Sequence, residues 1–443
     1  IYNIKKKVKL EKLVLSFLIP VGMIYLMLVF PTVAADEHFH LFKTYEVSKG
    51  VFISSKEEAT TVPRDLSVCG SKVKTFANFN DALSWDTDYS DEVEVNNTFK
   101  SYPSYLYMFG SIGFVISRAL DLNIYIGCLL AKLINFTCFL ITIYYSIKIL
   151  PFGKYVLIGI AFMPMVLHQA VSTSADCMIN NIAILFISFI TYLIFKEKDI
   201  NNKELVGLGI LGILLAVSKY VYTPIVGMIL ILLFSKKLSK NKKQIAIPLI
   251  IVISGIITIA CFMFSNSYVS GHRAYLDSIG QDSAGQVKWI INNPKSFIDV
   301  MMVTLDEKSF YFITQMIGST LGELDINVSY TPIIFYIVFL VVICFIEENK
   351  VAFSTKQKIY IMFLNIVSIF LVILSLYISW DGVGDPKVEG VQGRYFIPIA
   401  FLTLLCICKK ENFVKIKNAQ YKILIMACLL NIAPMVTLYQ SLL

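Results

Sequence analysis

Apolar runs of about twenty residues recur along the whole chain, and no other feature constrains its fold so strongly. The hydrocarbon core of a bilayer is about 30 Å thick, so a spanning helix needs about 20 mostly apolar residues. The sequence is 56% hydrophobic and only 16% charged, whereas a soluble domain carries about a quarter charged residues. The sequence therefore predicts an all-α polytopic membrane protein, with residues 1–443 forming a single polytopic membrane domain.

Basic residues set the predicted orientation of the spans, because Lys and Arg gather in cytoplasmic loops. The N-terminal segment KKKVKLEK is strongly basic and is expected in the cytoplasm, before a first span over about Leu13–Phe30. Ten further spans are expected at 123–147, 155–171, 176–195, 204–218, 221–235, 244–265, 331–346, 358–379, 395–408 and 421–440. Threading them alternately puts every lysine cluster inside, which predicts about 11 transmembrane helices. The abundance of Ile, Lys and Asn favours an AT-rich bacterium, and hence a bacterial plasma membrane.

Two large segments, 31–122 and 266–330, are then expected on the extracytoplasmic face. Residues 35–100 carry twelve Asp and Glu against seven Lys and Arg. The apolar segment 102–120 would invert every later loop if it crossed the membrane, so an interfacial or re-entrant helix is expected there. The alternative is an ordinary span with a missed neighbour. The first extracytoplasmic loop is thus predicted to fold into juxtamembrane helices on the membrane surface.

The charge and cysteine content argue against a nucleic-acid-binding protein and against a disulfide-rich protein. The net charge of +8 comes from lysines in short loops, where topology explains them, so no nucleic-acid partner is expected. The nine cysteines lie mostly in apolar runs and are interpreted as small apolar residues, not as a disulfide framework. A cleavable leader ending near TVAA is the alternative for the first span. That apolar stretch is long for a leader and continues directly into an acidic motif.

The titratable residues of the predicted outer face come from five separate places in the sequence. The motif ADEHFH contributes Asp36, Glu37, His38 and His40 at the end of the first span. The others are Asp176, Lys219 with Tyr220, His272 with Arg273 and Asp277, and Arg394. Ionisable residues at membrane depth are costly, which favours a functional role. The alternative is that loop ends are simply polar, but the inner loops have no comparable mixture of acids, His and Arg.

Carboxylates beside cations at a membrane surface suit glycosyl transfer from a lipid-linked donor. A carboxylate can take the proton of an acceptor hydroxyl. Arg binds phosphate through two points and Lys as a point charge, and either stabilises a leaving phosphate. No Walker motif is present to bind a nucleotide. A polyprenyl-phosphate-linked sugar is therefore the expected donor, and the lipid bilayer itself is an expected partner.

Five motifs, in order along the chain, resemble a bacterial membrane-protein family numbered 2142 among domains of unknown function. They are ADEHFHLFKTYEVSKG, YPSYLYMFG, MPMVLHQAVSTSAD, SKYVYTPI and GVQGRYFIPIA. The family in turn resembles the GT-C glycosyltransferase superfamily, in which the first outer loop carries a catalytic acid followed by surface helices. The resemblance implies a GT-C-like fold and a cell-envelope or capsular glycan as the acceptor.

The resemblance also implies roles for individual residues. Asp36 matches the acid of the first loop and is the candidate base, with Glu37 as the alternative. Lys219 and Arg394 match cations that would face the donor phosphate, and Arg273 is expected to join them. His38, Asp176, Tyr220 and Tyr395 are expected to support these groups. The glycines at 390 and 393 favour close approach of the backbone to a bulky group near Arg394.

The question of a metal stays open at the level of sequence. The DEHFH cluster could hold a divalent cation together with Asp176, but no further close ligand is visible. Residues two apart on a helix diverge, so His38 and His40 would not share a face. His38 is therefore expected to be a hydrogen-bonding neighbour of the base, and no cofactor is assigned.

Two other functions compete with the transferase. A transporter or flippase of lipid-linked glycan would place charges at mid-membrane and show two related halves, and neither feature is evident. A polysaccharide polymerase would also use outer Arg residues. It would not need Asp36.

Overall fold

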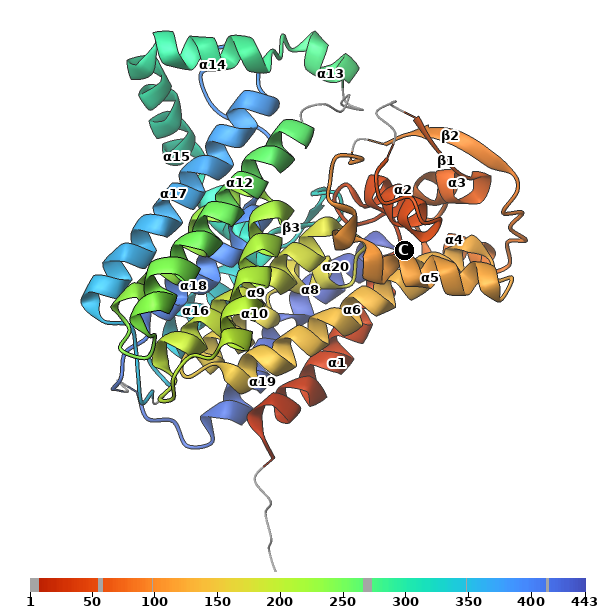
Figure 1. Ribbon diagram of the computed structural model, residues 1–443. Helices are drawn as coiled ribbons and strands as arrows, with labels where there is room; N and C mark the ends of the chain where they lie inside the picture. Colours follow the sequence, from red (N-terminus) through yellow and green to blue (C-terminus); the bar gives the residue numbers. More distant parts are fainter. Residues whose placement is uncertain (1–7, 55–58, 98, 266–272, 348, 412–413) are drawn as a thin grey trace, which may run out of the picture.

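The computed structural model describes residues 8–54, 59–97, 99–265, 273–347, 349–411 and 414–443. Helices form a tilted bundle, and a smaller lobe made from the first loop lies beside it, at the right of Figure 1. The strands within the described residues make only two short two-stranded sheets. The predicted all-α polytopic class is confirmed, whereas the count of eleven spans stays a prediction.

Within the described residues, six helical segments are long and apolar enough to cross a membrane. They are built from α1 (Leu10–Leu28), α6 (Ile124–Ile149), α9 (Ala175–Phe195), η4 (Lys242–Ala246) with α12 (Ile247–Ser265), α17 (Thr355–Ser379), and α19 (Ala419–Leu430) with α20 (Ile432–Ser441). Shorter helices of the bundle are α7 (Lys154–Ala161), α8 (Pro164–Ala170), α10 (Asn202–Ser218), η2 (Tyr220–Tyr222), α11 (Thr223–Val226), η3 (Gly227–Phe234), α16 (Tyr330–Ile343), η5 (Gly393–Phe396) and α18 (Ile397–Ile407).

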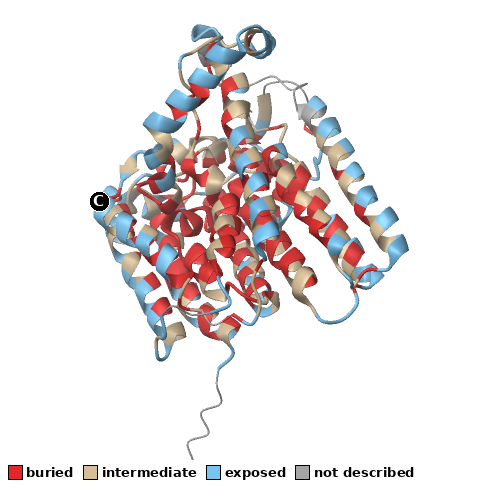
Figure 2. Ribbon diagram, turned by 90° about the vertical axis from the view of Figure 1, so that its left-hand side faces the viewer, coloured by how far each residue is buried: buried red, intermediate tan, exposed pale blue. Residues whose placement is uncertain are grey.

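Helix α9 lies in the interior of the bundle and α12 at its edge. Of the 18 most apolar consecutive residues in α9, 67% are buried. In the corresponding stretch of the segment that includes α12, 11% are buried. Buried residues gather in the middle of the molecule and exposed ones at its margins (Figure 2). The exposed side chains of α12 are themselves apolar: Leu249, Val252, Ile256, Ile259 and Met263. A helix that is apolar all round and sits at the edge of a bundle is suited to face lipid.

Three prolines begin helices instead of kinking them. Pro164, Pro224 and Pro398 occupy the first turns of α8, α11 and α18. Proline is tolerated there because the first backbone N–H groups of a helix have no partner within it. The expected span 155–171 is consequently two helices, α7 and α8, broken just before Pro164.

The first loop folds into a lobe of short elements. They are α2 (Glu37–Ser48), β1 (Ala59–Pro63), α3 (Arg64–Lys72), α4 (Phe76–Leu83), β2 (Glu92–Asn96), η1 (Ser104–Leu106) and α5 (Met108–Ala119). β1 and β2 pair antiparallel, from Ala59 opposite Asn96 to Pro63 opposite Glu92. At 12 residues, α5 is about 18 Å long, which is too short to cross about 30 Å of hydrocarbon.

The second large loop contains a long helix that the sequence analysis did not foresee. Its described elements are α13 (Arg273–Ser278), α14 (Ser283–Asn292), α15 (Pro294–Ile317), β3 (Thr320–Leu321) and β4 (Ile326–Asn327). α13 and α14 lie at the top of Figure 1, and α15 leads back into the bundle to pack against η5. A search for apolar runs does not detect α15, because charged residues interrupt its apolar sequence. They are Lys295, Asp299, Asp306, Glu307 and Lys308.

Candidate functional site

Four charged residues from distant parts of the chain meet in the structure, and we call them the charged cluster: Asp36, Asp176, Lys219 and Arg394. Asp36 immediately precedes α2, and Asp176 lies in the first turn of α9. Lys219 follows α10, and Arg394 lies in η5. The fold thus brings together four of the residues that the sequence singled out.

Arg394 is at the centre of the charged cluster, and its side chain is only 3% exposed. Its Nη2 donates to Asp36 Oδ2 over 2.7 Å, and its Nη1 donates to the carbonyl of Ala35 over 3.1 Å. Its Nε lies 3.2 Å from Asp176 Oδ2, without the alignment of a hydrogen bond. Arg394 therefore points into the protein and holds two carboxylates at once, instead of reaching toward lipid headgroups.

Lys219 completes the charged cluster from the other side of Asp176. Its Nζ lies 3.7 Å from Asp176 Oδ1, and 3.5 Å from the centroid of the Tyr395 ring. A cation over an aromatic face is attracted by the ring quadrupole. Tyr395 is itself fixed by the hydroxyl of Tyr222, which donates to its carbonyl over 2.8 Å. The ammonium is thus held between a carboxylate and an aromatic ring.

Asp36 has a backbone conformation that is uncommon for residues other than glycine, although Asp adopts it more often than most. Its φ is 63°, in the left-handed region, and its side chain does not cap α2. Such conformations are costly and are often found at functional sites. The Asp36 side chain is 32% exposed, whereas that of Asp176 is 11% exposed. Asp36 is therefore the more accessible carboxylate of the charged cluster.

Two similar local sequences present the two cations. In KYVYTP, Lys219 precedes a 3₁₀ turn and then the helix begun by Pro224. In RYFIP, Arg394 lies in a 3₁₀ turn that precedes the helix begun by Pro398. In both, a basic residue and a Tyr lie at a tight turn just before a proline-initiated helix.

The glycines beside Arg394 serve packing within the protein. A Cβ on Gly393 would lie 2.4 Å from the carbonyl oxygen of Phe312 and from the backbone nitrogen of Met316, both in α15. Gly390 has φ 67°, and a Cβ there would meet the ring of Trp380. The bulky group that these glycines were expected to approach is therefore the protein itself.

Glu37 points away from the charged cluster, although it is adjacent to Asp36. It is fully buried. Its Oε1 accepts from the backbone N–H of Thr173 over 2.8 Å and lies 3.8 Å from Nζ of Lys132. Its Oε2 accepts from the backbone N–H of Ala34 over 3.2 Å. A carboxylate committed to these partners anchors the first loop to the bundle and cannot reach a substrate without breaking them.

Four other predicted residues are not members of the charged cluster or have side chains outside the described residues. His38 is at the rim, with Nδ1 3.4 Å from Oε1 of Glu323. Tyr220 is 37% exposed and follows Lys219 in η2. Arg273 begins α13, but its side chain is outside the described part of the chain. His272 is likewise outside the described residues.

His40 lies near the charged cluster, and the sequence analysis considered it only as a possible metal ligand within DEHFH. Its ring stacks on Phe99 at 4.4 Å between centroids, and Nδ1 lies 2.8 Å from the hydroxyl of Tyr107. Burial lowers the pKa of His40 to about 3, against the opposing effect of Asp36 and Asp176. The imidazole is consequently neutral. Its position four residues after Asp36 was the available signal, because residues i and i+4 share a helix face.

The donor set around Asp36 does not suit a divalent cation. Asp36 and Asp176 both face Arg394, and His38 lies against Glu323. Within the described residues, no group of three or more His, Cys, Asp or Glu side chains is arranged to hold a metal ion. The divalent cation that DEHFH could have held is therefore given no part in the proposed chemistry.

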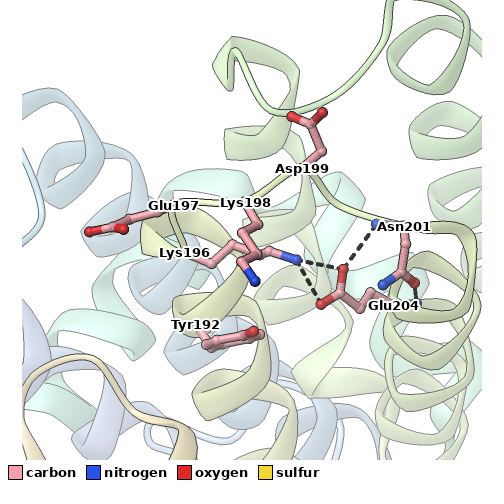
Figure 3. Close-up of a pocket in the computed structure, with 7 residues that line it drawn as sticks. All are labelled: Tyr192, Lys196, Glu197, Lys198, Asp199, Asn201 and Glu204. Atoms are coloured by element: carbon pink, nitrogen blue, oxygen red, sulfur yellow. Dashed lines mark hydrogen bonds and ion pairs between the residues drawn. The ribbon is translucent and has the colours of Figure 1, made fainter.

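A depression in the protein surface lies at the opposite end of α9 from Asp176. It has a volume of about 520 Å³ and is lined by Tyr192, Lys196, Glu197, Lys198, Asp199, Asn201 and Glu204 (Figure 3). Lys196 and Glu204 form an ion pair of 2.8 Å across it. The 21 residues of α9 separate this loop from the charged cluster by about 30 Å. The depression is thus a separate feature of the α9–α10 connection.

The fold and the charged cluster define a polytopic helical membrane protein with mixed acids and cations gathered at one place. The chain belongs to the family described as "Predicted membrane protein (DUF2142)", whose model matches residues 19–403. The family predicted from the five sequence motifs is thereby confirmed, and it is a family of unknown function. No curated protein and no solved structure matches the chain. The likeness to the GT-C superfamily stays a hypothesis.

Proposed function

We propose that this protein is a membrane glycosyltransferase of GT-C type, which transfers a sugar from a polyprenyl-phosphate donor to an envelope glycan. The observation that carries the proposal is the meeting of Asp36 with Lys219 and Arg394, from three distant elements, around the buried Asp176. The reaction needs a base for the acceptor hydroxyl and cations for the leaving phosphate. The charged cluster provides both types of group within one site.

In this proposal Asp36 accepts the proton of the acceptor hydroxyl. Its hydrogen bond from Arg394 orients the carboxylate. A carboxylate can serve as the base if the transition state has oxocarbenium-like character, because the hydroxyl becomes more acidic as it bonds to the sugar carbon. The partial exposure of Asp36 supports this assignment over the buried Glu37.

Lys219 is the better placed of the two cations to bind the donor phosphate. An ammonium has three N–H donors, and Asp176 at 3.7 Å takes at most one of them. Arg394 already donates to Asp36 and to the carbonyl of Ala35. Its part is therefore to position Asp36 and to add positive charge behind the phosphate. The C1–O bond of the donor breaks, and the phosphate leaves with the electron pair.

We propose that the charged cluster faces the extracytoplasmic side of a bacterial plasma membrane. The distribution of lysines supports this orientation, because the basic loops alternate with the segments that carry the charged cluster. The short, amphipathic helix α5 supports a position of the first-loop lobe at the membrane surface. Its exposed apolar residues Met108, Ile112 and Val115 recur at helical spacing.

The proposal is tested by analysing lipid-linked sugars and envelope glycan in cells with and without the protein. A transferase predicts that one polyprenyl-phosphate sugar accumulates while the envelope glycan loses that sugar. In intact cells, periodate, which does not cross the membrane, should oxidise the accumulated sugar, because the sugar has already reached the outer face. Periodate-resistant accumulation would indicate a flippase, and shortened polymer with unchanged sugar composition would indicate a polymerase.

A further inference from the structure

Glu37 closes the tight turn in which Asp36 lies. Its backbone N–H donates to the carbonyl of Ala34 over 2.8 Å, and its Oε2 accepts from the backbone N–H of Ala34 over 3.2 Å. Asp36 is inside this turn and has a left-handed φ of 63°. Such a conformation is costly and persists only where the surrounding contacts enforce it. The two hydrogen bonds between Glu37 and Ala34 are contacts of this kind.

The same carboxylate reaches the loop that carries Asp176. Oε1 of Glu37 accepts from the backbone N–H of Thr173 over 2.8 Å and from the hydroxyl of Thr173 over 3.3 Å. Thr173 lies in the turn just before Asp176, and the intervening Ser174 accepts from the backbone N–H of Asp176 over 3.3 Å. Glu37 and Thr173 are both buried. One side chain thus joins the two backbone segments that carry the acids of the charged cluster.

Lys132 in α6 is the cation that faces this carboxylate. Its Nζ lies 3.8 Å from Oε1 of Glu37 and donates to the carbonyl of Val29, which follows α1. Like Glu37, Lys132 is fully buried. A buried charge is costly unless it is paired and hydrogen-bonded, and removing one partner of a buried pair leaves the other charge uncompensated. Lys132 therefore permits a carboxylate at position 37 and links it to the end of α1.

We propose that Glu37 is a positioning residue that fixes Asp36 relative to Asp176, with Lys132 as its counter-ion. The inference rests on the proposed glycosyl transfer, because Glu37 does not touch the substrate and acts through Asp36. Reacting groups must be held precisely, since a displacement of about 1 Å can cost about a hundredfold in rate. The two adjacent acids of the ADEHFH motif therefore have different parts: Asp36 reacts, and Glu37 holds it in place.

Glu37→Gln keeps the shape of the side chain and replaces one acceptor oxygen by an amide NH₂ group. The backbone N–H of either Ala34 or Thr173 then loses its acceptor. We expect the rate of sugar transfer at saturating donor to fall about ten- to a hundredfold. The dissociation constant for a polyprenyl phosphate should stay unchanged, because Tyr395 also holds Lys219. An unchanged transfer rate in Glu37→Gln would overturn the proposal.

Glu46→Gln is the matched control, because Glu46 is also a buried acid of α2 and pairs with the buried Lys43 over 3.2 Å. Breaking either buried pair should lower the thermal midpoint of the protein. We expect only Glu37→Gln to lower the transfer rate per folded protein. Equal losses of rate in the two variants would reduce Glu37 to a structural role and overturn the proposal.

A double variant shows whether Glu37 acts through Asp36. If it does, Glu37→Gln should change the residual rate of Asp36→Asn only slightly, because the group that it positions is already lost. Losses of rate that multiply in the double variant would contradict the proposal. Thr173→Val removes only the hydroxyl hydrogen bond to Glu37, so it tests the same link even if Glu37→Gln does not fold. It should lower the transfer rate by a smaller factor, and an unchanged rate would contradict the link.

Hydrogen exchange measured by mass spectrometry tests the inference without an assay of transfer. In Glu37→Gln, the peptides that contain Ala34 and Thr173 should exchange faster than in the unaltered protein, because a backbone N–H without an acceptor is less protected. In Glu46→Gln they should exchange as in the unaltered protein. Unchanged exchange of both peptides in Glu37→Gln would overturn the inference. If their exchange rises but the unaltered protein transfers no sugar, the proposed function fails while the link between the two acid-bearing segments stands.

Discussion

At the scale of single residues, Arg394 holds the charged cluster together through several donors at once. Nη1 and Nη2 bind the carbonyl of Ala35 and the carboxylate of Asp36, and Nε faces Asp176. Lysine offers a point charge and cannot reproduce this planar set of donors. A residue that merely reached toward lipid headgroups would tolerate the exchange.

Arg394→Lys should therefore lower transfer markedly while the protein still inserts. The loss of one charge-assisted hydrogen bond costs about 1.5–3 kcal/mol, or roughly ten- to a hundredfold in rate. The measurement is the initial rate of transfer from the accumulated donor in membranes with equal amounts of protein. Arg64→Lys is the matched control, because Arg64 forms an exposed ion pair with Asp91 in the same lobe. Equal rates in both variants would contradict the account of Arg394.

The sequence could single out Asp36, Lys219 and Arg394, because each is an ionisable residue at the end of an apolar run. It could not separate Asp36 from Glu37. Neighbouring residues near a helix start differ by about 100° in direction, and only packing decides which faces the interior. The structure turns Glu37 toward Lys132 and Asp36 toward Arg394. The same limit explains why the sequence favoured His38 over His40.

At the scale of elements, η5 depends on its close contact with α15. Gly393→Ala should destabilise the protein, because the new Cβ would lie 2.4 Å from backbone atoms of α15, which cannot yield as a flexible side chain can. Overpacking of this kind costs about 1–3 kcal/mol. Thermal unfolding in detergent should show a lower midpoint. Gly255→Ala in α12 is the control, because nothing lies within 4 Å of its added Cβ. An unchanged midpoint in Gly393→Ala would show that η5 can move away freely.

The loop between α17 and η5 contains a buried acid whose ionisation should affect stability. Oδ1 of Asp381 accepts from the backbone N–H of Glu389 over 3.0 Å. Burial, the largest cause, raises the pKa of Asp381 to about 7, and the neighbouring acids Asp385 and Glu389 act in the same direction. Because the folded-state pKa is raised, the contribution of Asp381 to stability is present at low pH and is lost as pH rises through about 7.

Asp381→Asn keeps the acceptor oxygen and removes the ionisation. We expect the variant to match the unaltered protein near pH 4, to gain on it as pH rises to about 7, and to exceed it in thermal midpoint near pH 8. The comparison is made in one buffer series, so that other titrating groups cancel. A difference in midpoint that is constant from pH 5 to pH 8 would contradict the assignment.

The sequence predicted some helices of the structure closely and missed others. Apolar runs predicted most helices of the bundle within a few residues, because lipid requires long uninterrupted apolar sequence. They did not predict α15, whose charged residues interrupt the run. Nor did they predict that Pro164 would divide one expected span into α7 and α8. In α15, packing against neighbouring helices outweighs the local pattern, whereas at Pro164 the proline itself ends one helix and begins the next.

At the scale of the whole molecule, the proposed function depends on which face of the membrane each loop occupies. Ser90, between α4 and β2, and Ser239, between η3 and η4, are both exposed in the structure. An impermeant maleimide added to intact cells should label Ser90→Cys and spare Ser239→Cys. The unaltered protein serves as the blank, because its nine cysteines are buried or half-buried. Labelling of Ser239→Cys in intact cells would invert the proposed faces.

Asp36→Asn tests most directly whether Asp36 is the base of a lipid-linked glycosyl transfer. The substitution preserves size and removes the charge, and a general base contributes about a hundredfold or more. The measurement is the rate of sugar transfer from the polyprenyl-phosphate donor to envelope glycan, at equal protein abundance. Asp91→Asn is the control, because Asp91 is an exposed acid in the same lobe, paired with Arg64. We predict that Asp36→Asn loses transfer about a hundredfold while Asp91→Asn keeps it; near-normal transfer in Asp36→Asn would contradict the mechanism.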